Sequence, residues 1–159
     1  MNYDVFLKLE NKTLIKSDEE TEQRFMERIF RELFAVGQEE RIYAMLRPRF
    51  RSCDAAQRSL AVAFTVEPWM LNPQDTLHGG VMSTALDMTM SVLARYCKKQ
   101  RAVSTIQLSV NFLRPINDQE TFIVIAEADH VGRRSVMIRA EIRMETNNKL
   151  VATASGVFM

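Results

Sequence analysis

The chain contains very little cysteine. Its 159 residues include two, Cys53 and Cys97, and the spacing of this pair fits neither a metal-ligand motif nor a redox motif. Two cysteines are also too few to form the disulfide framework of a small secreted domain. The composition therefore favours a reducing compartment, and we expect a cytoplasmic protein.

The sequence also lacks an excess of either charge, and it lacks long apolar runs. It has 21 basic and 20 acidic residues and a net charge of +1, so its composition favours neither nucleic acid nor an anionic membrane as a partner. No uninterrupted apolar run approaches the roughly 20 residues that span a bilayer. Residues 1–16 lack the basic-then-apolar order of a signal peptide. We expect a single soluble domain, because a chain of 159 residues can bury a core without disulfides or metals.

Helical patterns occupy the first part of the chain. We expect residues 1–16 to be irregular or briefly extended, and a capping box formed by Ser17 and Glu20 predicts the start of a helix. Gly37 is a suitable C-terminal stop, and a second helical piece is expected over 38–46. The apolar positions of the first helix recur at helical spacing, and they are Phe25, Met26, Ile29, Phe30, Leu33 and Phe34.

Strand patterns follow, interrupted by one long helix. Apolar alternation begins at Arg58 and closes at Pro68, the helix is expected over 80–96, and four further alternating segments complete the chain. A helix that is apolar around its circumference needs a curved sheet wrapped around it and a further cover. These features predict an α+β domain that dimerises, with its last four strands paired as an antiparallel meander. The four segments are 105–112, 122–129, 135–144 and 150–158.

The stretch 71–93 contains the strongest candidates for catalytic groups. It leads from a polar loop through His78, Gly79 and Gly80 into the apolar helix. Glycines at the start of a helix present unpaired N–H groups that a ligand can approach closely. Donors of this kind stabilise the oxyanion that develops in acyl transfer.

Asp87 places a carboxylate on this helix. It lies seven residues beyond Gly80, about two turns and roughly 10 Å along the axis. Its neighbours on that side form a polar strip of Ser83, Thr84 and Ser91. A buried carboxylate is costly without partners, and one held near a thioester could act as a general base or a nucleophile. Taken singly, a histidine beside glycines is more often a capping residue and a helical aspartate more often faces solvent, but the combination favours catalysis.

Two motifs, HGGVMSTALDMTMSV and VSTIQLSVNFLRP, resemble those of the hot-dog-fold acyl-CoA thioesterases of the PaaI type. The resemblance covers roughly Arg58 to Phe158 and implies a long central helix wrapped by an antiparallel sheet. It also implies that two subunits join their sheets edge to edge and build each active site between them. On this basis residues 58–159 form a hot-dog thioesterase domain, and residues 1–57 form an N-terminal extension of amphipathic helices that covers the sheet or the acyl pocket.

The resemblance also implies roles for the residues around the helix start. Asp87 takes the role of base or nucleophile, and the backbone N–H of Gly79 or Gly80 is the oxyanion donor. His78 and Asn72 match positions that hold the thioester or the attacking water.

A hydroxyl group is expected from the partner subunit. Thr105 falls close to the matching position of the family, and Ser104 is the alternative if the register differs by one. One position departs from the family pattern, because Asp75 stands where many relatives have glycine three residues before the histidine. Aspartate adopts the left-handed backbone conformation more readily than most residues, so the loop can keep the same conformation with aspartate at this position.

Further side chains are candidates for substrate contact. The phosphates of coenzyme A would lie at the rim of a dimer cleft, within reach of three arginines in turns, Arg114, Arg133 and Arg134. The simpler interpretation of each is a solvated turn residue. Met82 is a candidate for the wall of an adaptable acyl tunnel, although methionine more often fills a core, and Ser83 is a candidate polar contact beside it.

Three functions fit these observations. The first is a homodimeric or dimer-of-dimers acyl-CoA thioesterase that hydrolyses a medium- or long-chain fatty acyl or an aryl-acyl thioester. It requires no metal or redox cofactor, since coenzyme A enters as part of the substrate. The second is a non-catalytic acyl-CoA-binding module with the same pocket. The third is a hydratase or dehydratase acting on β-hydroxyacyl or enoyl thioesters.

Overall fold

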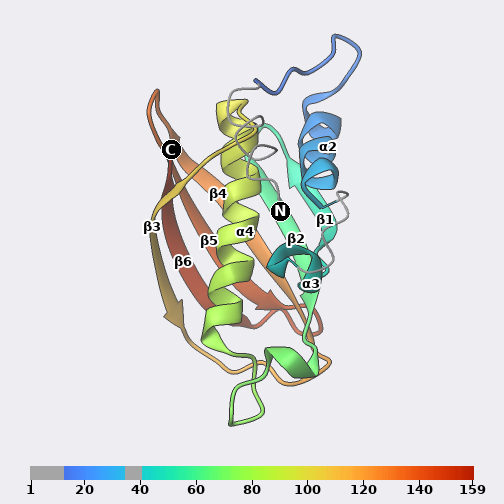
Figure 1. Cartoon of the computed structure of the whole chain (residues 1–159), viewed down its shortest axis with the longest axis vertical. Helices are drawn as coiled ribbons and strands as arrows, with labels where there is room; N and C mark the ends of the chain where they lie inside the picture. The colour runs from blue at the N-terminus through green and yellow to red at the C-terminus, as the bar shows by residue number, and fades with distance from the viewer. Residues whose placement is uncertain (1–12, 35–40) are drawn as a thin grey trace.

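The fold is a curved antiparallel sheet wrapped around one long helix (Figure 1). The computed structural model describes residues 13–34 and 41–159, so the predictions for residues 1–12, Gly37 and the start of the second helical piece lie outside the described residues. The elements are α2 (Glu22–Phe34), α3 (Ile42–Met45), β1 (Arg49–Asp54), β2 (Ser59–Thr65), η1 (Pro68–Met70), α4 (Gly79–Lys98), β3 (Thr105–Phe112), β4 (Thr121–Val131), β5 (Val136–Met144) and β6 (Leu150–Phe158).

The strand order corrects the predicted meander. The sheet runs β1-β2-β4-β5-β6-β3, so β4, β5 and β6 form a meander but β3 pairs with β6 instead of β4. The connection from β3 to β4 is tied to the loop before α4, because Leu77 N–H donates to the Ile116 carbonyl at 2.8 Å and Ile116 is fully buried. This path carries the chain away from β3, which remains at the edge of the sheet.

The structure also contains a strand that the sequence patterns missed. β1 pairs antiparallel with β2 from Arg49↔Ala63 to Asp54↔Ser59. Its residues, RFRSCD, lack a clear alternation of apolar side chains, so the strand depends on pairing with its neighbour. The sheet therefore begins before residue 58, inside the segment expected to be a helical extension.

α4 is the centre of the hydrophobic core. It extends from Gly79 to Lys98, slightly beyond the predicted bounds, and ends at Lys99 in the left-handed conformation (φ 54°). Its buried side chains meet the inner faces of β2, β4, β5 and β6. In the described part of the chain, no helix is both long and apolar enough to cross a membrane.

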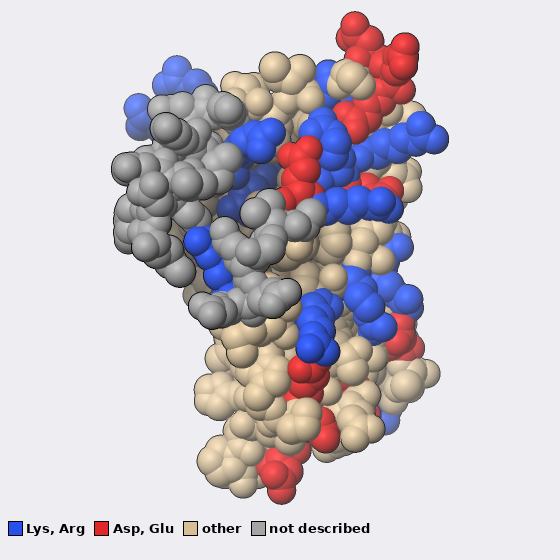
Figure 2. Space-filling model, turned by 45° about the vertical axis from the view of Figure 1, so that its right-hand side comes forward, with Lys and Arg blue, Asp and Glu red and all other residues tan. Residues whose placement is uncertain are grey.

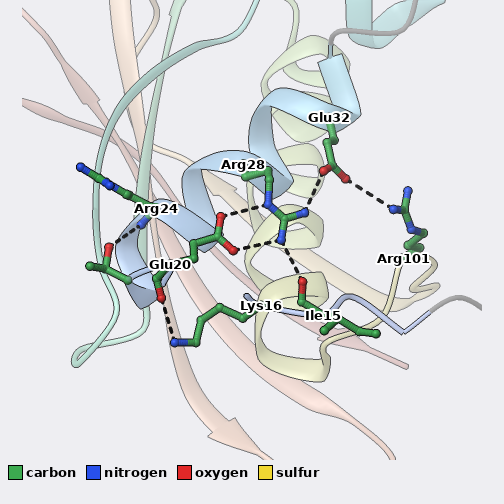
Figure 3. Close-up of polar contacts among 8 residues, drawn as sticks. Ile15, Lys16, Glu20, Arg24, Arg28, Glu32 and Arg101 are labelled. Atoms are coloured by element: carbon green, nitrogen blue, oxygen red, sulfur yellow. Dashed lines mark hydrogen bonds and ion pairs between the residues drawn. The ribbon is translucent and has the colours of Figure 1, made fainter. Parts of the chain in front are cut away.

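The start of α2 differs from the predicted capping box. Thr21, and not Ser17, caps the helix, since its carbonyl accepts from Phe25 N–H at 2.9 Å and its hydroxyl accepts from Arg24 N–H at 3.2 Å. The Glu20 carboxylate instead binds Arg28 through two hydrogen bonds of 3.0 and 3.1 Å (Figure 3). The Glu20 carboxylate thus binds a charged partner nearly two helical turns inside α2 and not the backbone at the helix start.

α2 is fastened to the C-terminal end of α4 by a mixed polar and aromatic cluster. The Glu22 carboxylate accepts hydrogen bonds from the Tyr96 hydroxyl at 2.7 Å and from Lys99 Nζ at 3.1 Å. The Lys99 ammonium also lies 4.5 Å from the centroid of the Phe25 ring, a favourable cation–π distance. These contacts hold the pKa of Glu22 below its ordinary value, with the Tyr96 hydrogen bond as the largest cause.

Glu22→Gln is therefore expected to lower the free energy of unfolding at neutral pH by about 1 kcal/mol. Because the pKa of Glu22 is lowered in the folded state, its contribution is present above the unfolded pKa and is lost as the pH falls through the folded pKa. The difference between parent and variant should shrink below about pH 4.3, the ordinary pKa of glutamate. Urea unfolding of both proteins at pH values above and below this pKa measures the difference in the free energy of unfolding, with Glu19→Gln as the control. A difference in the free energy of unfolding that does not change with pH would show that the ionised Glu22 carboxylate does not stabilise the fold.

The surface that carries α2 and β1 mixes both signs of charge. Figure 2 shows lysine and arginine side chains interleaved with acidic ones on this side of the molecule. Arg31 pairs with Glu27 at 2.5 Å, and Arg51 pairs with Glu145. Neighbouring charges on this face therefore compensate one another.

Candidate active site

His78 organises the start of α4. It is the N-cap residue, and its Nδ1 accepts a hydrogen bond from Gly80 N–H at 2.8 Å. Its carbonyl accepts from Val81 N–H at 2.9 Å and from Met82 N–H at 3.1 Å. In the neutral ring, a nitrogen that accepts carries no proton, so Nε2 carries it and can donate outward. His78 thus shapes the helix start and presents a donor beside it.

These bonds distinguish between the two candidate oxyanion donors. The N–H of Gly80 is occupied by His78, whereas the N–H of Gly79 donates to no other residue of the described chain. Gly79 is the first residue of α4, where the positive end of the helix dipole lies. The geometry therefore favours Gly79 over Gly80 as the donor.

Phe112 packs directly against this glycine, a contact that the sequence patterns missed. A Cβ atom on Gly79 would lie 3.3 Å from the ζ carbon of the Phe112 ring. Phe112 ends β3, and its ring is 51% exposed. The signal in the sequence was an aromatic residue at the end of an alternating strand. Its position beside α4 follows from the order of the strands in the sheet.

Asp87 is held by Thr105 of the same chain. The Thr105 hydroxyl donates to Asp87 Oδ1 at 2.7 Å. Ser104, the alternative, exchanges backbone hydrogen bonds of 2.7 and 2.9 Å with Met159. The predicted arrangement, in which Thr105 of a second copy meets Asp87, is therefore wrong in this respect, because the hydroxyl and the carboxylate come from one chain.

A β-bulge explains why Thr105 and not Ser104 faces the helix. The pairing of β3 with β6 shifts between Thr105 and Gln107, so that Thr105 lies opposite Phe158 while Leu108 lies opposite Gly156. Phe158 is fully buried on the inner face, and residues directly opposite in a sheet share a face. Regular alternation from Leu108 would have turned Ser104 inward instead.

The hydroxyl groups of the predicted polar strip are bonded within α4. The hydroxyls of Ser83, Thr84 and Ser91 donate to the carbonyls of earlier helical residues, each at 2.9 Å. Met82 is 4% exposed and belongs to the core, so its predicted contact with substrate is replaced by packing. Within the predicted polar strip, Asp87 is the residue whose side chain is hydrogen-bonded to another element, β3.

Asn72 closes the loop before His78. Its Oδ1 accepts from the N–H of Gln74 at 2.9 Å and of Thr76 at 3.2 Å, and its Nδ2 donates to the Thr76 hydroxyl at 3.0 Å. Asp75 adopts the left-handed backbone, with φ 55°, as its place in the family pattern implied. The side chain of Asn72 therefore shapes the loop, and its contact with substrate stays a prediction.

The three candidate arginines lie at opposite ends of α4. Arg114 follows β3 and donates to the Leu150 carbonyl at 2.5 Å. Arg133 and Arg134 lie in the β4–β5 turn, where Lys98 at the far end of α4 donates to the Arg133 carbonyl at 2.6 Å. Since α4 is 20 residues long, about 30 Å, the three do not converge on one ligand within a single chain.

The described residues contain no cluster of three or more histidine, cysteine or acidic side chains that could hold a metal ion. The candidate site has two parts. One is the helix start at His78 and Gly79, and the other is the Asp87–Thr105 pair about two turns further along α4.

Known proteins resemble this chain in sequence and in fold. A family model described as the thioesterase superfamily matches residues 74–151. A Pseudomonas aeruginosa protein whose name places it among the esterases is 31% identical over 115 residues, covering 72% of this chain and 84% of that protein. The acyl-coenzyme A thioesterase THEM4 of Bos taurus is 25% identical over 92 residues, covering 58% of this chain but 37% of that protein.

Solved structures confirm the predicted hot-dog fold. A Ralstonia eutropha protein related to phenylacetic acid degradation has a TM-score of 0.72 and 26% identity, covering 84% of this chain and 98% of that one. The E. coli PaaI protein of the phenylacetic acid degradation operon has a TM-score of 0.68 and 22% identity, covering 84% of this chain and 93% of that one.

Proposed function

Because the chain belongs to the thioesterase superfamily and is a thioester hydrolase, we propose that it hydrolyses a medium- or long-chain fatty acyl-CoA or an aryl-acyl-CoA to the free acid and coenzyme A. The observation that carries the proposal is the Asp87–Thr105 hydrogen bond of 2.7 Å. It orients a carboxylate that remains partly accessible on a largely buried helix. In this position the carboxylate can activate water or attack a thioester carbonyl.

The two parts of the site are too far apart to act on one carbonyl within a single chain. Asp87 lies eight residues beyond Gly79, about 12 Å along the helix. An oxyanion donor must come within about 3 Å of the carbonyl oxygen, and the attacking atom within about 3–3.5 Å of the carbonyl carbon. A second copy of the chain must therefore supply one of the two parts.

The free edge of β3 supports such a dimer. β3 is hydrogen-bonded on one side to β6 and ends the sheet. Its apolar side chains remain partly exposed, with Ile106 56% exposed and Phe112 51%. Antiparallel pairing of two β3 strands would bring Thr105 and Asp87 of one chain beside Phe112 and Gly79 of the other. Each complete site would then combine the carboxylate of one subunit with the helix start of its partner.

Ser109→Lys is expected to yield a monomer with little thioesterase activity, because Ser109 is exposed on β3 and a charge on an edge strand opposes edge-to-edge pairing. Light scattering coupled to gel filtration measures the mass, and thiol release measures the activity. Gln57→Lys introduces the same charge in the β1–β2 turn, away from this edge, and serves as the control. A monomeric variant with the parent's activity would contradict the shared site.

A screen of acyl-CoAs of different chain length, with detection of the released thiol, tests the proposed function. Release of thiol identifies the substrate class and excludes the non-catalytic alternative. Saturable binding of acyl-CoA without thiol release would instead support an acyl-CoA-binding module. Loss of the enoyl absorbance without thiol release would support a hydratase.

A further inference from the structure

Arg95 is a cation on α4 that the proposed reaction does not use. It lies eight residues beyond Asp87, on the same side of the helix and about 12 Å further along it. Its Nε is buried and has no hydrogen-bond partner among the described residues. Within residues 13–34 and 41–159, its side chain forms no ion pair.

A buried guanidinium nitrogen without a hydrogen-bond partner is costly. Burial removes water from the cation, and the loss is compensated only when hydrogen bonds and an opposite charge replace it. Burial accordingly lowers the pKa of Arg95. Arg101 also has a buried Nε without a partner, but its guanidinium lies 3.8 Å from the Glu32 carboxylate of α2 (Figure 3). Arg95 differs in that no carboxylate of the described residues pairs with it.

Tyr43 of α3 is close enough to Arg95 and Asp87 for both charges to act on its hydroxyl. Two groups act electrostatically on the Arg95 cation, and they are Tyr43 of α3 and Asp87. Partial burial and the charge of Asp87 raise the pKa of Tyr43, so its hydroxyl stays a donor. On either side of Tyr43, α3 exposes apolar surface from Ile42 and Met45. The Tyr43 hydroxyl and the Arg95 guanidinium therefore offer two hydrogen-bond donors beside exposed apolar side chains of α3.

We propose that Arg95, assisted by Tyr43, binds a carboxylate at the far end of the acyl chain, so that the substrate class is an ω-carboxyacyl-CoA. This inference rests on the proposed thioesterase function. The planar guanidinium can bind a carboxylate through two parallel hydrogen bonds, and a carboxylate carried by the substrate supplies the missing partner of the buried cation. The carbonyl of the same substrate lies at Asp87, and its methylene chain spans the interval between the two residues.

The test compares suberyl-CoA with octanoyl-CoA, which share a chain length and differ in the terminal carboxylate. We expect the parent enzyme to have the higher kcat/KM for suberyl-CoA. Arg95→Gln should lower the ratio of the two kcat/KM values by about tenfold to a hundredfold, mainly through KM. Arg95→Lys should retain part of the preference, and Arg101→Gln, the matched control, should retain the parent ratio.

The outcomes separate this inference from the proposed function. If the parent hydrolyses octanoyl-CoA but does not prefer suberyl-CoA, or if Arg95→Gln keeps the parent ratio, the carboxylate site is wrong and the thioesterase function stands. If the parent releases thiol from neither compound and from no other acyl-CoA of the screen, the proposed function fails. Calorimetric titration of the same two compounds then decides whether Arg95 still distinguishes them.

Discussion

Asp87→Asn is expected to lower kcat/KM for the best acyl-CoA substrate by about 10²- to 10⁴-fold. The amide has the shape of the carboxylate, and its oxygen can still accept the hydrogen bond that the Thr105 hydroxyl donates to Asp87 at 2.7 Å. It cannot take a proton from water or attack a carbonyl, so the variant removes the chemistry and keeps the packing. Thiol release under subsaturating substrate measures the loss.

The control for this variant is Asp18→Asn, which removes the same charge from an exposed turn and should keep the parent's activity. Thr105→Val should cause a smaller loss than Asp87→Asn, because the carboxylate remains but is no longer oriented. An Asp87→Asn protein that folds and dimerises like the parent, yet turns over as fast, would show that the carboxylate plays no part in hydrolysis.

Gly79→Pro is expected to lower kcat by about 10²- to 10³-fold, the usual effect of removing one oxyanion donor. Proline is well accepted at the first residue of a helix, where its missing N–H breaks no helical bond. The preceding residue, His78, has an extended backbone with ψ 133°, the conformation that a following proline requires. The variant thus deletes the proposed donor while the helix can still form.

Gly79→Ala is the matched control, since alanine keeps the N–H and adds the Cβ that meets the Phe112 ring at 3.3 Å. Comparing the two variants separates the loss of the donor from the displacement of Phe112. We expect alanine to cause the smaller loss. Equal losses for alanine and proline would indicate crowding against Phe112 and would remove Gly79 N–H from the mechanism.

The parts of the fold that local patterns govern were predictable from the sequence. The glycine pair and the apolar run located α4 to within a few residues, and the period-two alternation located five of the six strands. β1 was not predicted, because it has only a weak alternation of apolar residues and depends on its pairing with β2. The edge position of β3 was not predicted, because it depends on the pairing of β3 with β6, which is distant in the sequence and leaves no local pattern.

The candidate site shows the same division. Residue types and spacing were sufficient to single out Asp87 and the helix start. The choice between Thr105 and Ser104 was not accessible, because it depends on the bulge beside Ile106, and bulges leave no reliable mark in a single sequence. The choice of Gly79 over Gly80 likewise required the position of the His78 ring.

The two lysines at the end of α4 fix the rotation of the helix about its own axis. Lys98 binds carbonyl groups of the β4–β5 turn, and Lys99 binds Glu22 of α2, so neighbouring residues are anchored to different elements. At the other end, the loop before His78 is tied to the β3–β4 connection. A helix held in this way can neither turn nor slide without breaking several bonds. The angle at which Asp87 meets Thr105 is therefore set by contacts at both ends of α4, remote from the reacting groups.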